Sequence, residues 1–172
     1  MNKRSAPIAA AAVFILVGAG TSAMPQPAPQ PAPAPQPAGS APSAAYALTM
    51  GDMMNTLIQP RHAKLGLAGR AQNWALAAYA AAEIRQSFAG ISKAQPKFAG
   101  MPVGELVDAA VIPALNALDA AIKTQDSQKF AAAYDQLNQG CNACHVELAH
   151  AYVVIKTPDA STFPNQDFSA RQ

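Results

Sequence analysis

The chain has 172 residues, of which 51% are hydrophobic and only 13% are charged, a composition suited to one folded domain with its own core. Lysines and arginines number 12, against 10 aspartates and glutamates. Two of the basic residues, Lys3 and Arg4, lie at the very start of the chain, and without them the charges balance at ten of each. This balance argues against nucleic acid as a partner.

Residues 1–23 have the pattern of a secretory signal peptide. Lys3 and Arg4 precede an apolar run over residues 7–20, and small residues follow at 21–23. The run is short for a membrane span, which needs about 20 residues. We therefore expect export to the periplasm with cleavage after Ala23. The alternative is an uncleaved signal that tethers the protein to the membrane.

Residues 24–43 alternate proline with alanine and glutamine and contain no charged or aromatic residue. Such a segment cannot bury a core, so we expect a disordered linker, extended as polyproline II. We interpret it as a solvated tail left after signal removal, with a spacer that holds the domain away from a surface as the alternative. The folded domain is then expected over residues 44–172, with an irregular tail from about residue 153.

The domain is expected to be all-α. It is rich in alanine, leucine and glutamine, which favour helix, and its apolar residues recur every three or four positions. No segment has strand character. Four amphipathic stretches joined by short loops predict an antiparallel four-helix bundle. The predicted helices cover residues 46–65, 70–91, 103–123 and 127–152.

Prolines, glycines and one aspartate set the expected helix boundaries. Pro60 is expected to kink or break the first helix. Residues 66–69, which include two glycines, are expected to form the turn after it. Pro113 is expected to bend the third helix, and Asp126 to cap the start of the fourth.

The run Cys141-Asn-Ala-Cys144-His145 lies in the predicted last helix. Residues three apart share a helical face at about 5–6 Å, so two thiols at this spacing can bond to the two vinyl groups of one porphyrin. His145 lies one turn after Cys141, which brings an imidazole beneath the iron. Cys-x-x-Cys-His is the attachment pattern of c-type haem, and the chain has no other cysteine. We therefore predict one covalent haem c on Cys141 and Cys144, with His145 as the proximal iron ligand.

Three other uses of the two cysteines match the chain less well. A thioredoxin-like pair belongs in a βαβ unit, and no strands are expected. A zinc ion needs four ligands, whereas the motif offers three. A disulfide between cysteines three apart on a helix would be strained.

The segment 130–145, with this motif on the last helix of an exported helical domain, resembles the haem-binding helix of the cytochrome c-prime family, the class II cytochromes c. The resemblance covers about residues 44–152 and implies a four-helix bundle whose thioethers and iron ligand are the motif residues. The tail after Tyr152 is an addition to that pattern. Its two phenylalanines, Phe163 and Phe168, are expected either to cover a haem edge or to anchor the C-terminus.

The sixth iron ligand would decide the function, because His/Met ligation gives low-spin iron and a higher reduction potential. Counted from the predicted helix ends, Met53 lies at the level of His145, and Met50 lies within one turn of it. We take Met53 as the first candidate for the distal ligand and Met50 as the second, against the alternative that both only fill the core. His62 is a rival if the chain bends back at Pro60; otherwise it belongs to a solvated helix end or is a partner of the haem propionates.

Three functions follow from these alternatives. A periplasmic electron carrier with six-coordinate iron, which is not an enzyme, is preferred over a five-coordinate gas-binding or stress-protective haem protein. A haem enzyme such as a peroxidase ranks third, because it needs a distal acid/base pair and only His62 could supply the base. The expected partners are redox proteins, and a homodimer is left open.

Overall fold

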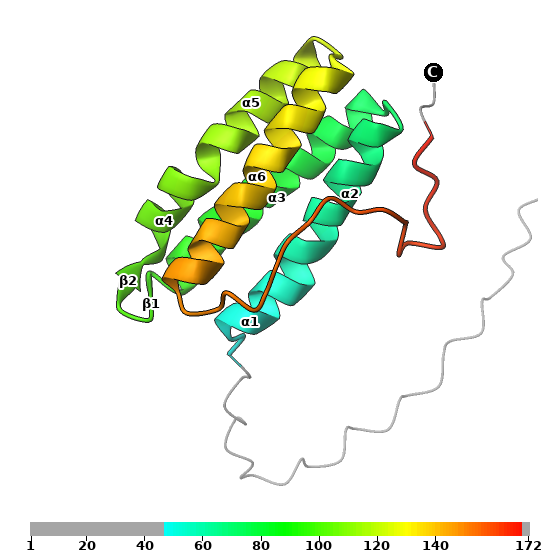
Figure 1. Cartoon of the computed structure of the whole chain (residues 1–172). Helices are drawn as coiled ribbons and strands as arrows, with labels where there is room; N and C mark the ends of the chain where they lie inside the picture. Colours follow the sequence, from blue (N-terminus) through cyan, green and yellow to red (C-terminus); the bar gives the residue numbers. More distant parts are fainter. Residues whose placement is uncertain (1–46, 170–172) are drawn as a thin grey trace, which may run out of the picture. The chain divides into compact units, whose positions relative to one another are not determined.

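The computed structural model describes residues 47–169, so the predictions for the signal peptide (1–23) and the linker (24–43) lie outside it. The described part is helical apart from one small hairpin, in which β1 (Lys97–Phe98) pairs antiparallel with β2 (Met101–Pro102) (Figure 1). The expectation that the domain has no strands is therefore wrong at this loop. The helices are α1 (Met50–Met53), the π-helical segment η1 (Met54–Ile58), α2 (Gln59–Arg70), α3 (Trp74–Ala94), α4 (Val103–Ala110), α5 (Ile112–Lys123) and α6 (Ser127–Glu147).

The long helices pack side by side around a shared apolar core (Figure 1). α2 packs on α3, α3 on α5 and α5 on α6, and α6 in turn packs on α2. Removal of apolar side chains from water drives this packing. It places α6, which carries the cysteine motif, between α5 and α2. The largest fully buried side chains include Leu65, Ile84, Leu115, Leu118 and Tyr134.

The elements α1, η1 and α2 form one continuous helical rod, here called the first helical rod. It runs through Pro60 without a break. α1 begins at Met50 behind a capping box formed by Thr49 and Asp52, and it leads through η1 directly into α2. A proline ring clashes with the carbonyl four residues earlier in a regular α-helix. The wider turn of a π-helical segment directly before Pro60 relieves that clash. The expected break at Pro60 is therefore wrong.

The expected turn at residues 66–69 is also helical, because its two glycines are contact points for α6. A Cβ atom on Gly66 would lie 2.7 Å from the Tyr134 side chain, and one on Gly69 would overlap the Phe130 ring. Both rings can therefore pack against α2 only where α2 has no side chain. These glycines allow two helices to approach each other, and they do not end one.

Three helix ends, those of α2, α5 and α6, use left-handed residues that are not glycine. Gln72, Gln125 and Ala149 have φ angles of 55°, 54° and 60°. After each of them, the next amide donates to the carbonyl five residues before it, as in a Schellman motif. α2 thus ends later than predicted, at Arg70, and α6 ends earlier, at Glu147. Glycine, the usual sequence signal for this turn, is missing at all three positions.

The third predicted helix, expected to bend at Pro113, is instead divided at Val111 into α4 and α5, and Pro113 lies in the first turn of α5. The expectation of one continuous helix over residues 103–123 is therefore wrong, whereas the predicted cap of the last helix is confirmed. Asp126 caps α6, where its side chain accepts hydrogen bonds from the amides of Gln128 and Lys129.

Gly140 marks a close approach of α6 to α4, and its substitution is expected to destabilise the protein. A Cβ atom at this position would overlap the Ala110 carbonyl, and backbone atoms cannot rotate away as a flexible side chain can. We expect Gly140→Ala to lower the free energy of unfolding by about 1–3 kcal/mol through overpacking. Urea denaturation is the measurement.

Gly90→Ala is the matched control, because a Cβ atom at Gly90, on an exposed position of α3, meets nothing within 4 Å. Alanine is the better helix former, so this variant is expected to gain up to about 1 kcal/mol. Equal effects of the two substitutions would contradict the close approach of α6 to α4.

Candidate functional site

The two cysteines of the motif lie near the C-terminal end of α6. Cys141 is buried, with 9% of its surface exposed, and Cys144 is half-buried. The Cys144 thiol donates a weak hydrogen bond to the Leu106 carbonyl of α4 at 3.9 Å. Both cysteines are free thiols. The helix therefore presents two unpaired sulfurs one turn apart, as attachment to one porphyrin requires.

Burial keeps both thiols protonated. It raises the pKa of Cys141 to about 12, with a smaller contribution from Cys144. Burial also raises the pKa of Cys144, with a smaller contribution from Glu147. Because the thiolate is the reactive form, neither cysteine is activated as a redox thiol. This state of the motif does not support a thioredoxin-like role.

The His145 ring is held by a backbone carbonyl of the tail. Its Nδ1 atom lies 2.7 Å from the Val153 carbonyl oxygen. A carbonyl oxygen can only accept a hydrogen bond, so Nδ1 carries a proton, and in the neutral ring the lone pair is on Nε2. Within residues 47–169, no hydrogen bond to Nε2 is formed. Ligating histidines are commonly fixed in this way, with one nitrogen donating to an acceptor and the other bound to the metal.

The tail is fastened to α6 by residues 153–157, here called the strap. Asn142, inside the motif, donates to the Ile155 carbonyl at 2.9 Å and accepts from the Ile155 amide at 2.7 Å. One turn earlier, Asn138 donates to the Thr157 hydroxyl at 2.9 Å. Sequence reasoning missed both asparagines. The one available signal was that they share a helical face with the motif histidine.

His62 is buried at the contact between α2 and α6, so the expectation of a solvated side chain is wrong. Its Nε2 donates to Asn138 Oδ1 at 2.8 Å, and its Nδ1 lies 3.0 Å from the Tyr134 hydroxyl. The same hydroxyl lies 2.8 Å from the His62 carbonyl oxygen, so its single proton is shared between that oxygen and Nδ1. Burial lowers the pKa of His62 to about 4, and the hydrogen bond with Asn138 opposes part of this effect. The ring is therefore neutral at pH 7, and both of its nitrogens have partners within the protein.

Contacts between α2 and α6 define how the first helical rod is aligned with the motif. They follow an antiparallel order: Phe130 with Gly69, Tyr134 with Gly66, and Asn138 with His62. Continued for two turns, this order places residues near Asn55 at the level of His145. Met53 lies close to that level and is buried, with 5% of its surface exposed. Met50, one turn earlier, is also buried, at 7%.

The two tail phenylalanines lie beside the first helical rod. Phe163 and Phe168 contact each other, with 6.0 Å between their ring centres, and the Lys64 ammonium lies 4.9 Å above the Phe163 ring. Asn73, in the turn between α2 and α3, donates to the Ser169 carbonyl at 3.0 Å. This turn is at the end where α6 begins, whereas the motif is at the end where α6 stops. These contacts favour the anchoring alternative over a haem cover.

His150 lies beyond α6, although the predicted last helix, residues 127–152, includes it together with His145. Because α6 ends at Glu147, the half-buried His150 ring lies near Phe98 and Tyr152, at 5.9 and 5.7 Å between ring centres. The placement of His150 on a continuing helix is therefore wrong.

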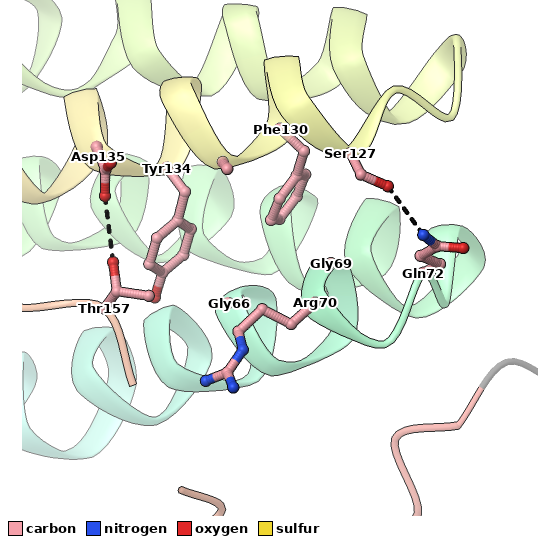
Figure 2. A pocket seen from close by; sticks show the side chains of 10 residues that line it. Gly66, Gly69, Arg70, Gln72, Ser127, Phe130, Tyr134, Asp135 and Thr157 are labelled. Carbon is pink, nitrogen blue, oxygen red and sulfur yellow. Dashed lines mark hydrogen bonds between the residues drawn. The ribbon is translucent and has the colours of Figure 1, made fainter. Parts of the chain in front are cut away.

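Two hollows lie along the first helical rod, and neither is lined by a motif residue. A cavity of about 530 Å³ lies between α2, the first half of α6 and Thr157 of the tail. Figure 2 shows the Phe130 and Tyr134 rings pointing into it from α6. A second hollow, of about 400 Å³, is lined by Met53 and by residues of α3. Hydrogen bonds cross the first cavity at its two ends, between Asp135 and Thr157 and between Ser127 and Gln72 (Figure 2).

The donor set of the motif suits a haem better than a bare metal ion. Within residues 47–169, no group of three or more His, Cys, Asp or Glu side chains is arranged to hold a metal ion, whereas zinc needs four ligands. A haem brings its own porphyrin nitrogens and asks the chain only for axial ligands and attachment points. No helix in this range is long and apolar enough to cross a membrane. No family model, curated protein or solved structure matches the chain.

Proposed function

We propose that the protein is an exported monohaem c-type cytochrome that carries electrons in the periplasm. Haem c is bound through thioethers at Cys141 and Cys144, and His145 is the proximal iron ligand. The observation that carries this proposal is the orientation of His145, whose Nδ1 donates to the Val153 carbonyl and leaves Nε2 for iron. The two free thiols on the same helix supply the attachment points.

The residues of this chain hold the haem and tune it. When bound, the haem iron takes up and releases one electron. Cys141 and Cys144 fix the ring to α6, and buried apolar side chains around Cys141 keep water away from it. The His145 imidazole, held in one tautomer by the tail, sets how much electron density reaches the iron.

As the fold, we propose the antiparallel four-helix bundle of the cytochrome c-prime family. The cycle of contacts from α2 through α3, α5 and α6 back to α2 supports it. The antiparallel order of the contacts between α2 and α6 supports it as well.

We propose Met53 as the distal ligand and Met50 as the second choice. The alignment of the first rod with α6 supports a ligand from this region, and π-helical segments such as the adjacent η1 are frequent at functional sites. His62 is less suited, because its ring nitrogens already bind Tyr134 and Asn138. Because both ring nitrogens are engaged in these bonds, His62 does not offer the free base that a peroxidase reaction needs.

The test is the visible spectrum of the reduced exported protein, with and without carbon monoxide. A methionine ligand predicts low-spin iron in the wild type. Met53→Ala is expected to give high-spin iron that binds carbon monoxide readily, because the sixth position opens. Met54→Ala, which changes the half-buried neighbour, is expected to keep the wild-type spectrum.

Two results would contradict parts of this proposal. A high-spin wild type that binds carbon monoxide rapidly would contradict the electron carrier and favour a five-coordinate gas-binding protein. A low-spin spectrum that survives both Met53→Ala and Met50→Ala would contradict methionine ligation alone.

A further inference from the structure

We propose that the strap, residues 153–157, is a positioning element for the proximal histidine. It fixes the tautomer of His145 and sets the strength of the bond between the imidazole and iron. The inference rests on the proposed haem attachment, and it gives a role to a segment that is an addition to the cytochrome c-prime pattern. Asn142 is the positioning residue, and it acts through Ile155 on the carbonyl of Val153.

The Val153 carbonyl reaches His145 because the chain reverses at the end of α6. The His150 amide donates to the His145 carbonyl at 2.6 Å, and the Val153 amide donates to the His150 carbonyl at 2.8 Å. These bonds return the chain to the side of α6 that bears the His145 ring. The 2.7 Å separation of Nδ1 and the Val153 oxygen is within the usual range for an N–H···O bond, at its short end. Donation to this oxygen makes the imidazole a more basic ligand.

Three contacts between the strap and α6 follow one another in the same order along both segments. Going along the strap, residues 153, 155 and 157 meet His145, Asn142 and Asn138 in turn. The strap residues span about 13 Å when extended. The seven steps from Asn138 to His145 span about 10 Å of helix. Because these lengths are similar, every second strap residue meets the next turn of α6.

The Asn142 clamp, together with the packing of Ile155 against the apolar core, holds the part of the strap next to His145. The Val153 and Val154 side chains are exposed, at 39% and 72%, so little hydrophobic free energy keeps them in place. Asn142 binds both the amide and the carbonyl of Ile155. The strap cannot slide along α6 without breaking both bonds.

The experiment measures the reduction potential of the holoprotein in Asn142→Ala and in the wild type. With the clamp removed, Val153 no longer holds the Nδ1 proton firmly, the imidazole donates less electron density, and ferrous iron is favoured. We expect the ratio of ferrous to ferric protein at a fixed potential to rise about tenfold, which raises a one-electron potential by about 59 mV. Hydrogen exchange of the Ile155 amide is the second readout, and it is expected to become faster.

Two further variants separate positioning from general stability. Asn142→Asp keeps an acceptor for the Ile155 amide and is expected to give a smaller shift in potential than Asn142→Ala. Gln139→Ala changes an exposed residue of the same helix that forms no hydrogen bond to the strap within the described residues, and it is expected to change neither the potential nor the exchange.

The outcomes distinguish the strap from the haem attachment, because the mass of each purified protein is measured first. If all variants carry haem but Asn142→Ala keeps the wild-type potential, the strap proposal is overturned and the proposed function stands. The same holds if the Ile155 amide exchanges no faster in Asn142→Ala. Wild-type protein that lacks haem would overturn both.

Discussion

Replacing both motif cysteines, Cys141→Ser together with Cys144→Ser, is expected to give an exported polypeptide that keeps no haem after denaturation. A thioether is a covalent bond, so the haem stays with the unfolded chain as long as one sulfur holds it. Coordination by His145 alone does not survive unfolding, because the site that fixes the ligand is lost. Mass spectrometry under denaturing conditions is the measurement: the wild type should carry one haem and the double variant none.

The single variants extend this test. Each leaves one thioether and one unsaturated vinyl group, so the larger conjugated system should move the absorption of the reduced haem to longer wavelength. Cys141→Ser is expected to yield less folded protein than Cys144→Ser, because Cys141 is the more deeply buried residue and a buried hydroxyl needs a partner. Gln139→Ser, an exposed change on the same helix, should keep the full haem content. Haem that survives denaturation in the double variant would contradict the proposed attachment.

Acidification from pH 6.5 to pH 4 is expected to destabilise the protein by roughly 3 kcal/mol through His62. Its pKa falls from 6.5 to about 4 on folding, because the ring is buried, and each pKa unit is worth about 1.36 kcal/mol. The folded state binds the proton less tightly than the unfolded state. The stability is therefore fully present above pH 6.5 and is lost as the pH falls toward 4. Urea denaturation at several pH values measures this slope.

His62→Gln is the variant that isolates this effect. An amide can donate and accept hydrogen bonds near Asn138 and Tyr134 but does not titrate, so the loss of stability between pH 6.5 and 4 should be much smaller. Its imperfect bonds are expected to cost about 1–3 kcal/mol at pH 7. His150→Gln, a change at the half-buried histidine beyond α6, is the matched control. Hydrogen bonds lower the pKa values of Asp126 and Asp159 from 3.8 in the folded protein. A His62→Gln variant with the wild-type slope would contradict the assignment.

The helices were predictable and several of their ends were not. Apolar residues at three- and four-residue spacing predict helix wherever one face is buried, and α3, α5 and α6 follow that pattern. The missed ends depend on residues such as Gln72 and Ala149, which adopt the left-handed conformation although glycine is the usual choice. Gly66 and Gly69, in contrast, suggest a turn but lie inside α2, because two rings of α6 pack there.

In the candidate site, too, some features were predictable from the sequence and others were not. The spacing of Cys141, Cys144 and His145 within one helix could be read directly, since it depends on five consecutive residues. The acceptor for the His145 ring could not, because Val153 lies beyond a reversal of the chain that no glycine or proline marks. The burial of His62 was hidden for a related reason: its partner Asn138 is 76 residues away in the sequence.

By itself the sequence determined that the domain is helical and that two thiols and an imidazole share one turn of its last helix. Both properties depend on spacings of three and four residues, which a helix converts directly into neighbours in space. Only the tertiary structure decided which nitrogen of His145 carries the proton, that His62 is buried and neutral, and that Asn142 holds the tail. These depend on which distant segments meet, and that is set by the packing of whole helices against one another.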